Sequence, residues 1–179
     1  MKTALTLVLG LAAGTAAAQN TMVGGAPMFP DRTIVENAVN SADHETLVAA
    51  VQAAGLVETL NGDGPFTVFA PTDAAFDMIS EESLNELLKP EHRDQLQTVL
   101  GCHVVQANAM SDAIMGMVAD DGGAHPVPTL GSCTLMATVS GGDIMLEDEN
   151  GRMATVTIAD VAQSNGVIHV IDRVLLPAQ

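Results

Sequence analysis

The chain has 179 residues, 47% of them hydrophobic, and this length fits a single domain with a proper core. Its 22 acidic residues outnumber its 6 basic residues, and the formal net charge of −16 disfavours binding to nucleic acid or to anionic lipid headgroups. Solubility alone explains such an acidic surface, and a surface bridged by calcium is the alternative.

Residues 1–18 have the features of a signal peptide. Lys2 supplies a positive start, residues 4–11 are apolar, and small residues precede a cleavage point near Ala18. The apolar stretch is too short for a comfortable membrane span, so we expect a protein that is secreted or periplasmic and has no membrane span. Residues 19–30 are predicted to be a flexible leader, and residues 31–179 the folded domain.

Helical periodicity dominates the first half of this domain. Asp31 is predicted to cap a short helix that reaches Ala38, and Ser41 or Asp43 to cap a second helix that Gly55 ends. Further helical segments are expected at residues 56–60, 74–79, 81–88, 90–100 and 111–118.

A short β-prone run from Thr67 to Ala70 interrupts the helices. Because Pro71 has no N–H to donate to a ladder, we expect the strand to end there. Thr72 lies where a helix N-cap belongs, and Ser80 is predicted to cap the next helix in the same way.

The last third of the chain changes from helical to alternating periodicity. Gly141-Gly142 and Asn150-Gly151 are predicted to join consecutive strands, and Asn165-Gly166 to form a turn before a β-branched strand. Helices early and strands late in the chain indicate an α+β domain. The expected strands in this half of the chain cover residues 104–105, 133–139, 143–147, 153–158, 167–171 and 174–176.

Two blocks, residues 64–76 and 164–177, resemble the signature segments of the fasciclin-like (FAS1) domain family. Between them that family usually carries a Tyr-His pair followed by Val-Val, and here the matching residues begin with Cys102 and His103, so that Cys102 takes the Tyr position. The resemblance runs from residue 31 to residue 177. It implies a β-sandwich or wedge of about seven strands with helices packed along one edge.

The resemblance also implies a function. It points to an extracytoplasmic, non-enzymatic adhesion, matrix or protein-interaction module whose partner is a cell-surface or matrix protein or polysaccharide, with weak self-association left open. The sequence has no Gly-x-Ser-x-Gly elbow, His-Glu-x-x-His pair or glycine-rich phosphate loop, and no cofactor is expected. The alternative is a secreted carrier of an apolar small molecule, either a lipid or a carotenoid.

The chain has two cysteines, Cys102 and Cys133, and export would place them in an oxidising compartment. One disulfide is the natural interpretation, and a copper or zinc site is the alternative.

Three residues are candidates for contact with a partner. In the family, the region of His103 has been discussed as an adhesion determinant, although a structural histidine bonded to nearby backbone fits the sequence too. Asp160 and Val161 occupy the place where animal members resemble an Asp-Ile integrin-recognition motif, although Asp160 also suits a turn or a cap. His169, inside a run of Val and Ile, is predicted to be structural.

The helix expected at residues 111–118 is rich in methionine. Met110, Ile114 and Met117 are candidates for an apolar groove that adapts to a lipid or pigment, whereas a Cu(I) site with His125 and simple filling of the core are the alternatives. The acidic residues 147–149 and 120–121 offer oxygen ligands, but the EF-hand spacing is missing. These loops are predicted to be solvated, and no metal site is predicted.

Overall fold

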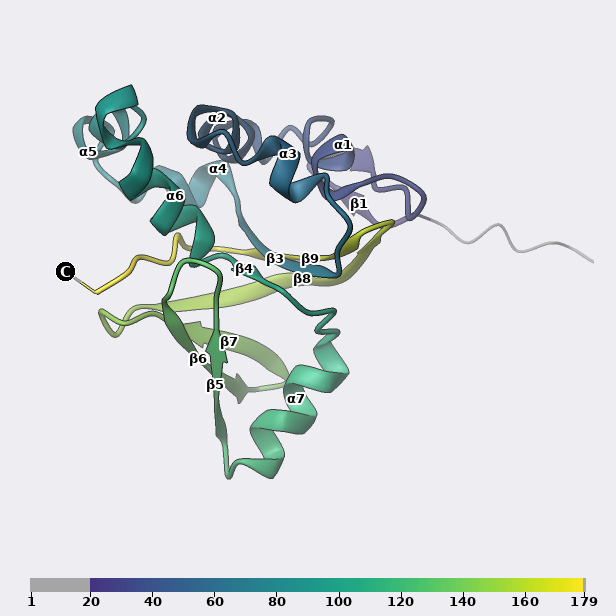
Figure 1. The fold of residues 1–179 in the computed structure, drawn as a ribbon. Coiled ribbons are helices and arrows are strands. Elements are labelled where there is room, and N and C mark those ends of the chain that lie inside the picture. The colour runs from purple at the N-terminus through teal and green to yellow at the C-terminus, as the bar shows by residue number, and fades with distance from the viewer. Residues whose placement is uncertain (1–19, 179) are drawn as a thin grey trace, which may run out of the picture.

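The computed structural model describes residues 20–178, which form a seven-stranded mixed sheet with helices on both sides (Figure 1). The strand order is β4-β3-β9-β8-β7-β6-β5, and within it only β3 and β9 run parallel. The predicted signal peptide and its cleavage point near Ala18 lie outside the described residues.

The described strands are β1 (Met22–Val23), β2 (Ala26–Pro27), β3 (Phe66–Pro71), β4 (Val104–Val105), β5 (Ala124–Pro128), β6 (Thr134–Ser140), β7 (Asp143–Glu147), β8 (Met153–Gln163) and β9 (Gly166–Ile171). The described helices are α1 (Ile34–Ala38), α2 (Glu45–Ala54), α3 (Val57–Leu60), α4 (Asp73–Phe76), α5 (Glu81–Leu87), the 3-10 helix η1 (Pro90–His92), α6 (Arg93–Gly101) and α7 (Ser111–Asp120). No helix within residues 20–178 is long and apolar enough to cross a membrane.

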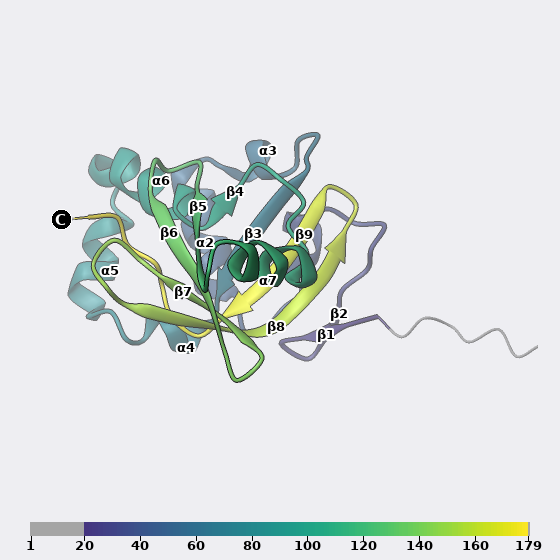
Figure 2. The same cartoon turned by 90° about the horizontal axis from the view of Figure 1, so that it is seen from below.

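The helices divide the molecule into two apolar cores. Helices α1 to α6 gather on one side of the sheet, and α7 lies on the other side beside β5, β6 and β7 (Figures 1 and 2). The first core joins the six helices to β3, β4 and β9, and the second lies between α7 and the strands β5 to β8. Strand β3 serves both cores, because its Val68 faces the first and its Phe69 the second.

The two ends of the sheet come close together, which gives it a nearly barrel-like shape. The amide of Leu130, just after edge strand β5, donates to the carbonyl of Val104 in edge strand β4 at 2.8 Å. We call this contact the seam.

Capping residues in the sequence correctly predicted where several helices begin or end. The hydroxyl of Thr72 accepts from the amide of Ala75 at the start of α4, and Ser80 caps α5 as expected. Gly55 ends α2 in the left-handed conformation, with φ of 71°.

The caps of α1 and α2 differ from the prediction. Thr33, not Asp31, caps α1 in a capping box with Glu36. Neither Ser41 nor Asp43 caps α2. Instead the carboxylate of Asp73 accepts from the first amides of α2, at 2.8 Å from Thr46, because α4 packs beside α2.

Of the segment 19–30, expected to be a flexible leader, the described residues 20–30 are largely built into the fold. Strands β1 and β2 pair in a hairpin, and Val23 and Met28 are each only 3% exposed within the first core. The prediction went wrong because Gly and Pro were interpreted as disorder, whereas Gly24 and Gly25 form the hairpin turn.

The strands predicted in the last third of the chain also differ from those in the structure. Residues 174–176, expected to be a strand, have no strand partner, although Val174 and Leu175 are buried. Strand β8 continues past residue 158 to Gln163 through register shifts. Strand β5 was not predicted, because Pro126 and Pro128 argue against a strand anywhere except at a sheet edge, which is where β5 lies.

Candidate functional site

Asp160 anchors α7 to the sheet. It lies at an irregularity of β8 with φ of 58°, an uncommon value for a residue other than glycine. Its carboxylate accepts from the amide of Ser111 at 2.7 Å and from the hydroxyl of the same residue. The negative charge therefore faces the N-terminus of α7, where the helix dipole favours it.

His169 extends this anchor from β9. Its Nδ1 accepts from the amide of Asp160 at 3.2 Å, which leaves the proton on Nε2 to be donated to the carbonyl of Ala109 at 2.7 Å. The ring is fully buried and stacks on Phe69, with centroids 5.7 Å apart. Burial lowers the pKa of His169, so the imidazole is neutral, and the predicted structural role fits this geometry.

Thr67 of β3 fixes the segment that leads into α7. Its hydroxyl donates to the carbonyl of Ala107 at 2.6 Å and accepts from the amide of Ala109 at 2.8 Å. Residues 107–111 are therefore held by side chains from three neighbouring strands, β3, β9 and β8.

A groove of about 390 Å³ lies between α7, the segment after β4 and the strand β5 with the residues that follow it. Its lining is mainly apolar and includes Phe69, Ile114, Val127 and the exposed side chains of Met117 and Leu130. We call this the α7 groove. Of the three residues expected at an apolar site, Ile114 and Met117 line the groove and Met110 does not.

His125 also lines the α7 groove. Its Nδ1 lies 2.6 Å from a carboxylate oxygen of Asp121, the residue that follows α7. A carboxylate is thus held beside the apolar lining.

His103 is buried and bonded on both sides. Its Nδ1 donates to the carbonyl of Val99 at 2.8 Å, and its Nε2 accepts from the amide of Leu175 at 2.9 Å. Burial lowers the pKa of His103 to about 4, which keeps the ring neutral at pH 7.

Two of the three candidate contact residues are therefore inside the fold. His103 is 2% exposed, and Val161 is 1% exposed because β8 continues past Asp160 and turns this side chain into the first core. Neither side chain is available to a partner in this structure. Asp160 is half-buried, and its carboxylate already binds Ser111.

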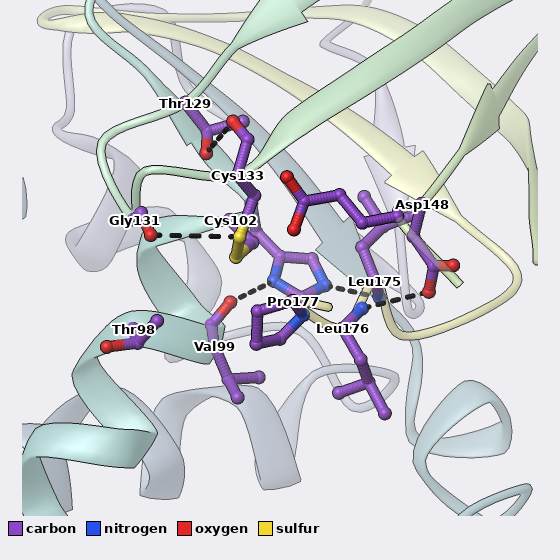
Figure 3. Close-up of a disulfide and its surroundings, with 12 residues drawn as sticks. Thr98, Val99, Cys102, Thr129, Gly131, Cys133, Asp148, Leu175, Leu176 and Pro177 are labelled. Atoms are coloured by element: carbon purple, nitrogen blue, oxygen red, sulfur yellow. Dashed lines mark hydrogen bonds between the residues drawn. A yellow bond between two sulfur atoms is a disulfide. The ribbon is translucent and has the colours of Figure 1, made fainter. Parts of the chain in front are cut away.

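Cys102 and Cys133 form a disulfide, which confirms the predicted pairing over a metal site (Figure 3). The bond joins the end of α6 to the loop between β5 and β6. That loop crosses α6 closely, because a Cβ on Gly131 would lie 2.4 Å from the carbonyl oxygen of Thr98. The disulfide therefore fastens the loop that carries Leu130 and the seam.

The acidic tip between β7 and β8, predicted to be a solvated loop, holds the C-terminal segment instead. Asp148 is buried, and its carboxylate accepts from the amide of Leu176 at 3.0 Å and from Nε of Arg152 at 3.1 Å. Glu149 accepts from the amide of Ala178, and the amide group of Asn150 donates to the carbonyl of Pro177.

The ionisation of Asp148 follows from these bonds. Burial alone would raise the pKa of its carboxyl, but the amides of Leu176, Arg152 and Asn150 and the charge of Arg152 outweigh burial, and the pKa lies below its usual value. The sequence offered one signal for this role, since an Asp two residues before an Asn, as Asp148 stands before Asn150, is typical of a turn in which the carboxylate accepts from the backbone amide two residues on.

The model of the Fasciclin domain family matches residues 42–177 of the chain. The chain belongs to the fasciclin domain family. This membership confirms the resemblance drawn from residues 64–76 and 164–177.

Several proteins are similar to this fasciclin domain. Protein sll1483 of Synechocystis sp. is 42% identical over 145 residues, which cover 81% of this chain and 73% of that protein. Transforming growth factor-beta-induced protein ig-h3 of Sus scrofa is 37% identical over 134 residues, which cover 74% of this chain and 18% of that protein. Fasciclin-1 of Drosophila melanogaster is 30% identical over 145 residues, which cover 78% of this chain and 21% of that protein.

The fold is that of a solved fasciclin domain. A FAS1 domain pair from the insect cell adhesion molecule Fasciclin I matches with a TM-score of 0.72 and 18% identity, covering 81% of this chain and 51% of that one. The match confirms the predicted α+β class and the FAS1 fold, here with seven strands in a mixed sheet and with helices on both sides of it.

Proposed function

We propose that this fasciclin domain acts outside the cytoplasm as a non-enzymatic adhesion or interaction module that binds a cell-surface or matrix protein or polysaccharide. The observation that carries the proposal is the fold match to a domain pair of an insect cell adhesion molecule. The features of a signal peptide in residues 1–18 support export.

The internal bonding of the reactive side chains supports a binding role over a chemical one. His103 and His169 are buried and neutral, and both of their ring nitrogens are bonded to backbone groups. The two cysteines form a disulfide, and Asp148 and Asp160 accept hydrogen bonds that hold segments of the chain. These groups maintain the fold, which leaves the exposed surface for recognition.

The test is binding of the labelled chain to cells and to extracellular matrix of its own host. We expect saturable binding that unlabelled chain displaces and that polyglutamate, a control for the acidic charge alone, does not displace. Binding that never saturates, or that polyglutamate displaces equally well, would contradict an adhesive role.

The α7 groove favours a second candidate, a carrier of an apolar lipid or carotenoid. Its volume of about 390 Å³ and its mainly apolar lining, including Phe69, Ile114 and Met117, are those of a small-molecule site. Protein purified from its host should then show a visible absorbance band or an additional stoichiometric mass in native mass spectrometry. A protein that stays free of ligand after incubation with carotenoids and fatty acids would exclude this role.

A further inference from the structure

Charge is unevenly distributed along the fasciclin domain. Residues 94–151 contain no Lys or Arg, and this stretch forms α7, β5, β6 and β7 together with most of α6. The basic residues of the described part lie outside it, at Arg32, Lys89, Arg93, Arg152 and Arg173. The stretch carries the acidic residues Asp94, Asp112, Asp120, Asp121, Asp143, Glu147, Asp148 and Glu149.

The α7 groove lies in this part of the domain. Met117, 36% exposed, and Leu130, 47% exposed, line it and present large apolar side chains to solvent. The carboxylate of Asp121 lies beside His125, which lines the groove. The residues that line the groove include no Lys or Arg, and α7 beside it carries Asp112 and Asp120 and is followed by Asp121. The groove is therefore complementary to a ligand that is apolar on one side and positively charged on the other.

The edge of the sheet restricts how a protein segment can bind here. Strand β5 is an edge strand, but Pro126 and Pro128 have no N–H to offer to an added strand. A partner therefore has to bind through its side chains, as an amphipathic helix does when its apolar face enters a groove. The methionine on the rim suits this mode, because a thioether side chain adapts its shape to its neighbour.

From these observations we infer that the α7 groove is a docking site for a cationic amphipathic helix of a partner protein. The inference rests on the proposed interaction function and names the partner's chemistry. Apolar side chains of the helix contact Met117 and Leu130, and its Lys and Arg side chains face the carboxylates of Asp112, Asp120 and Asp121.

The test uses a fluorescent peptide of leucine and lysine in which the leucines fall on one helical face, and a scrambled peptide of the same composition. We expect the patterned peptide to bind at least about tenfold more tightly than the scrambled one, because both carry the same charge and only one has an apolar face. We also expect the affinity to fall as salt is raised.

Three variants of the purified chain locate the contact. Met117→Glu and Leu130→Glu should each weaken binding by about tenfold, although each adds a negative charge that would otherwise attract the peptide. Met78→Glu is the matched control, because Met78 is 62% exposed and does not line the groove. It should bind as the unchanged chain does.

Equal binding of the patterned and scrambled peptides, or equal behaviour of Met117→Glu and Met78→Glu, would overturn the inference in favour of simple charge attraction. A lipid or carotenoid that fills the groove of a chain with no affinity for the patterned peptide would overturn it in favour of the carrier role. Cell binding by the unchanged chain and by Met117→Glu alike, with no binding of the patterned peptide to the unchanged chain, would reject the docking site and leave the adhesive function standing. Absent cell binding by the unchanged chain would reject that function itself.

Discussion

At the scale of single residues, two buried histidines join distant segments of the chain through hydrogen bonds. His103 connects α6 to the C-terminal segment, and His169 connects β9 to the segment before α7. In each ring one nitrogen accepts a hydrogen bond and the other donates one, so both bonds form only when the ring is neutral. A proton added to either ring places a second N–H against a backbone amide.

Stability should therefore fall in acid. The pKa of His103 is about 4 in the folded state against an ordinary value of 6.5, so the unfolded state binds more protons between these values. The contribution of this residue to the free energy of unfolding is fully present above about pH 6.5. It declines by roughly 3 kcal/mol in total as the pH falls to about 4. Urea unfolding at a series of pH values measures the decline.

His103→Gln provides the control for this pH dependence. The variant is less stable at pH 7 because glutamine cannot reproduce both ring contacts, but it has no proton to take up between pH 6.5 and pH 4. Its loss over that interval should be smaller than that of the unchanged chain. Equal slopes would show that His103 does not cause the acid sensitivity.

Position 166 requires glycine for a different reason, because two backbone segments pass close together there. A Cβ at this position would lie 1.9 Å from the carbonyl oxygen of Phe66, its neighbour in the parallel pair of β3 and β9. We expect Gly166→Val to lower the free energy of unfolding by at least about 3 kcal/mol or to prevent folding. Thermal unfolding followed by circular dichroism measures the loss.

Gly116 is the matched comparison, since it lies within α7 and a Cβ there would have no neighbour within 4 Å. Gly116→Ala should stabilise the chain by about 0.5–1 kcal/mol through its better helix propensity. A near-normal stability of Gly166→Val beside a stabilised Gly116→Ala would refute the close packing of β3 and β9.

At the scale of elements, α7 depends on anchors from elsewhere in the chain. The helix buries two of its ten residues, Ile114 and Val118, in the second core, and the bonds of Asp160, His169 and Thr67 to residues 107–111 set where it begins. An element held in this way opens more easily than one with a large buried face.

Asp160→Ala should release the first turn of α7. The variant loses the bonds to Ser111 and places alanine at a positive φ, so we expect the free energy of unfolding to fall by about 1–2 kcal/mol. Hydrogen exchange should quicken in the first turn of α7 while α2, in the other core, keeps its protection.

Ser111→Ala separates the two bonds made by Asp160, because it removes the hydroxyl and keeps the amide. Its effect should be smaller than that of Asp160→Ala. Unchanged exchange in Asp160→Ala would mean that α7 stands without this anchor.

The elements that the sequence predicted well are those with local signals. Thr72 and Ser80 cap helices that begin at the next residue, and Gly55 ends a helix through its own φ. The local capping box of Thr33 and Glu36 at α1 was missed, and two other helix starts are bonded by distant residues: Asp73 caps α2 from 27 residues away, and Asp160 binds Ser111 across 49 residues. Such contacts exist only after tertiary packing, so no short window of sequence contains them.

The residues of the α7 groove also divide into those that local spacing predicts and those that only tertiary packing brings in. Helical spacing brought Ile114 and Met117 together, and both line the α7 groove. Phe69 and Leu130 come from β3 and from the loop after β5, and no periodicity connects them to α7. His103 and Val161 are buried because of how their segments pack against the rest of the fold, and the family resemblance alone did not reveal this burial.

At the scale of the whole molecule, the disulfide and the seam close the sheet. Cys102 and Cys133 are separated by 31 residues, and their bond fixes the loop whose Leu130 amide donates to Val104. Replacing both cysteines by alanine should lower the free energy of unfolding by about 3–4 kcal/mol if the bond acts by restricting the unfolded chain. Urea unfolding of this variant beside the oxidised and reduced chain measures the loss, and an unchanged midpoint would show that the bond is energetically idle.

The segregation of basic residues also determines how the chain can be cut. Trypsin cleaves after Lys and Arg, so the stretch from Asp94 to Arg152 offers it no internal site even when the protein is unfolded. Both cysteines fall within that stretch, and the disulfide therefore closes a ring inside one tryptic fragment instead of joining two. Complete digestion releases α7, β5, β6 and β7 together as one cyclised piece, and only a protease that recognises other residue types can divide it.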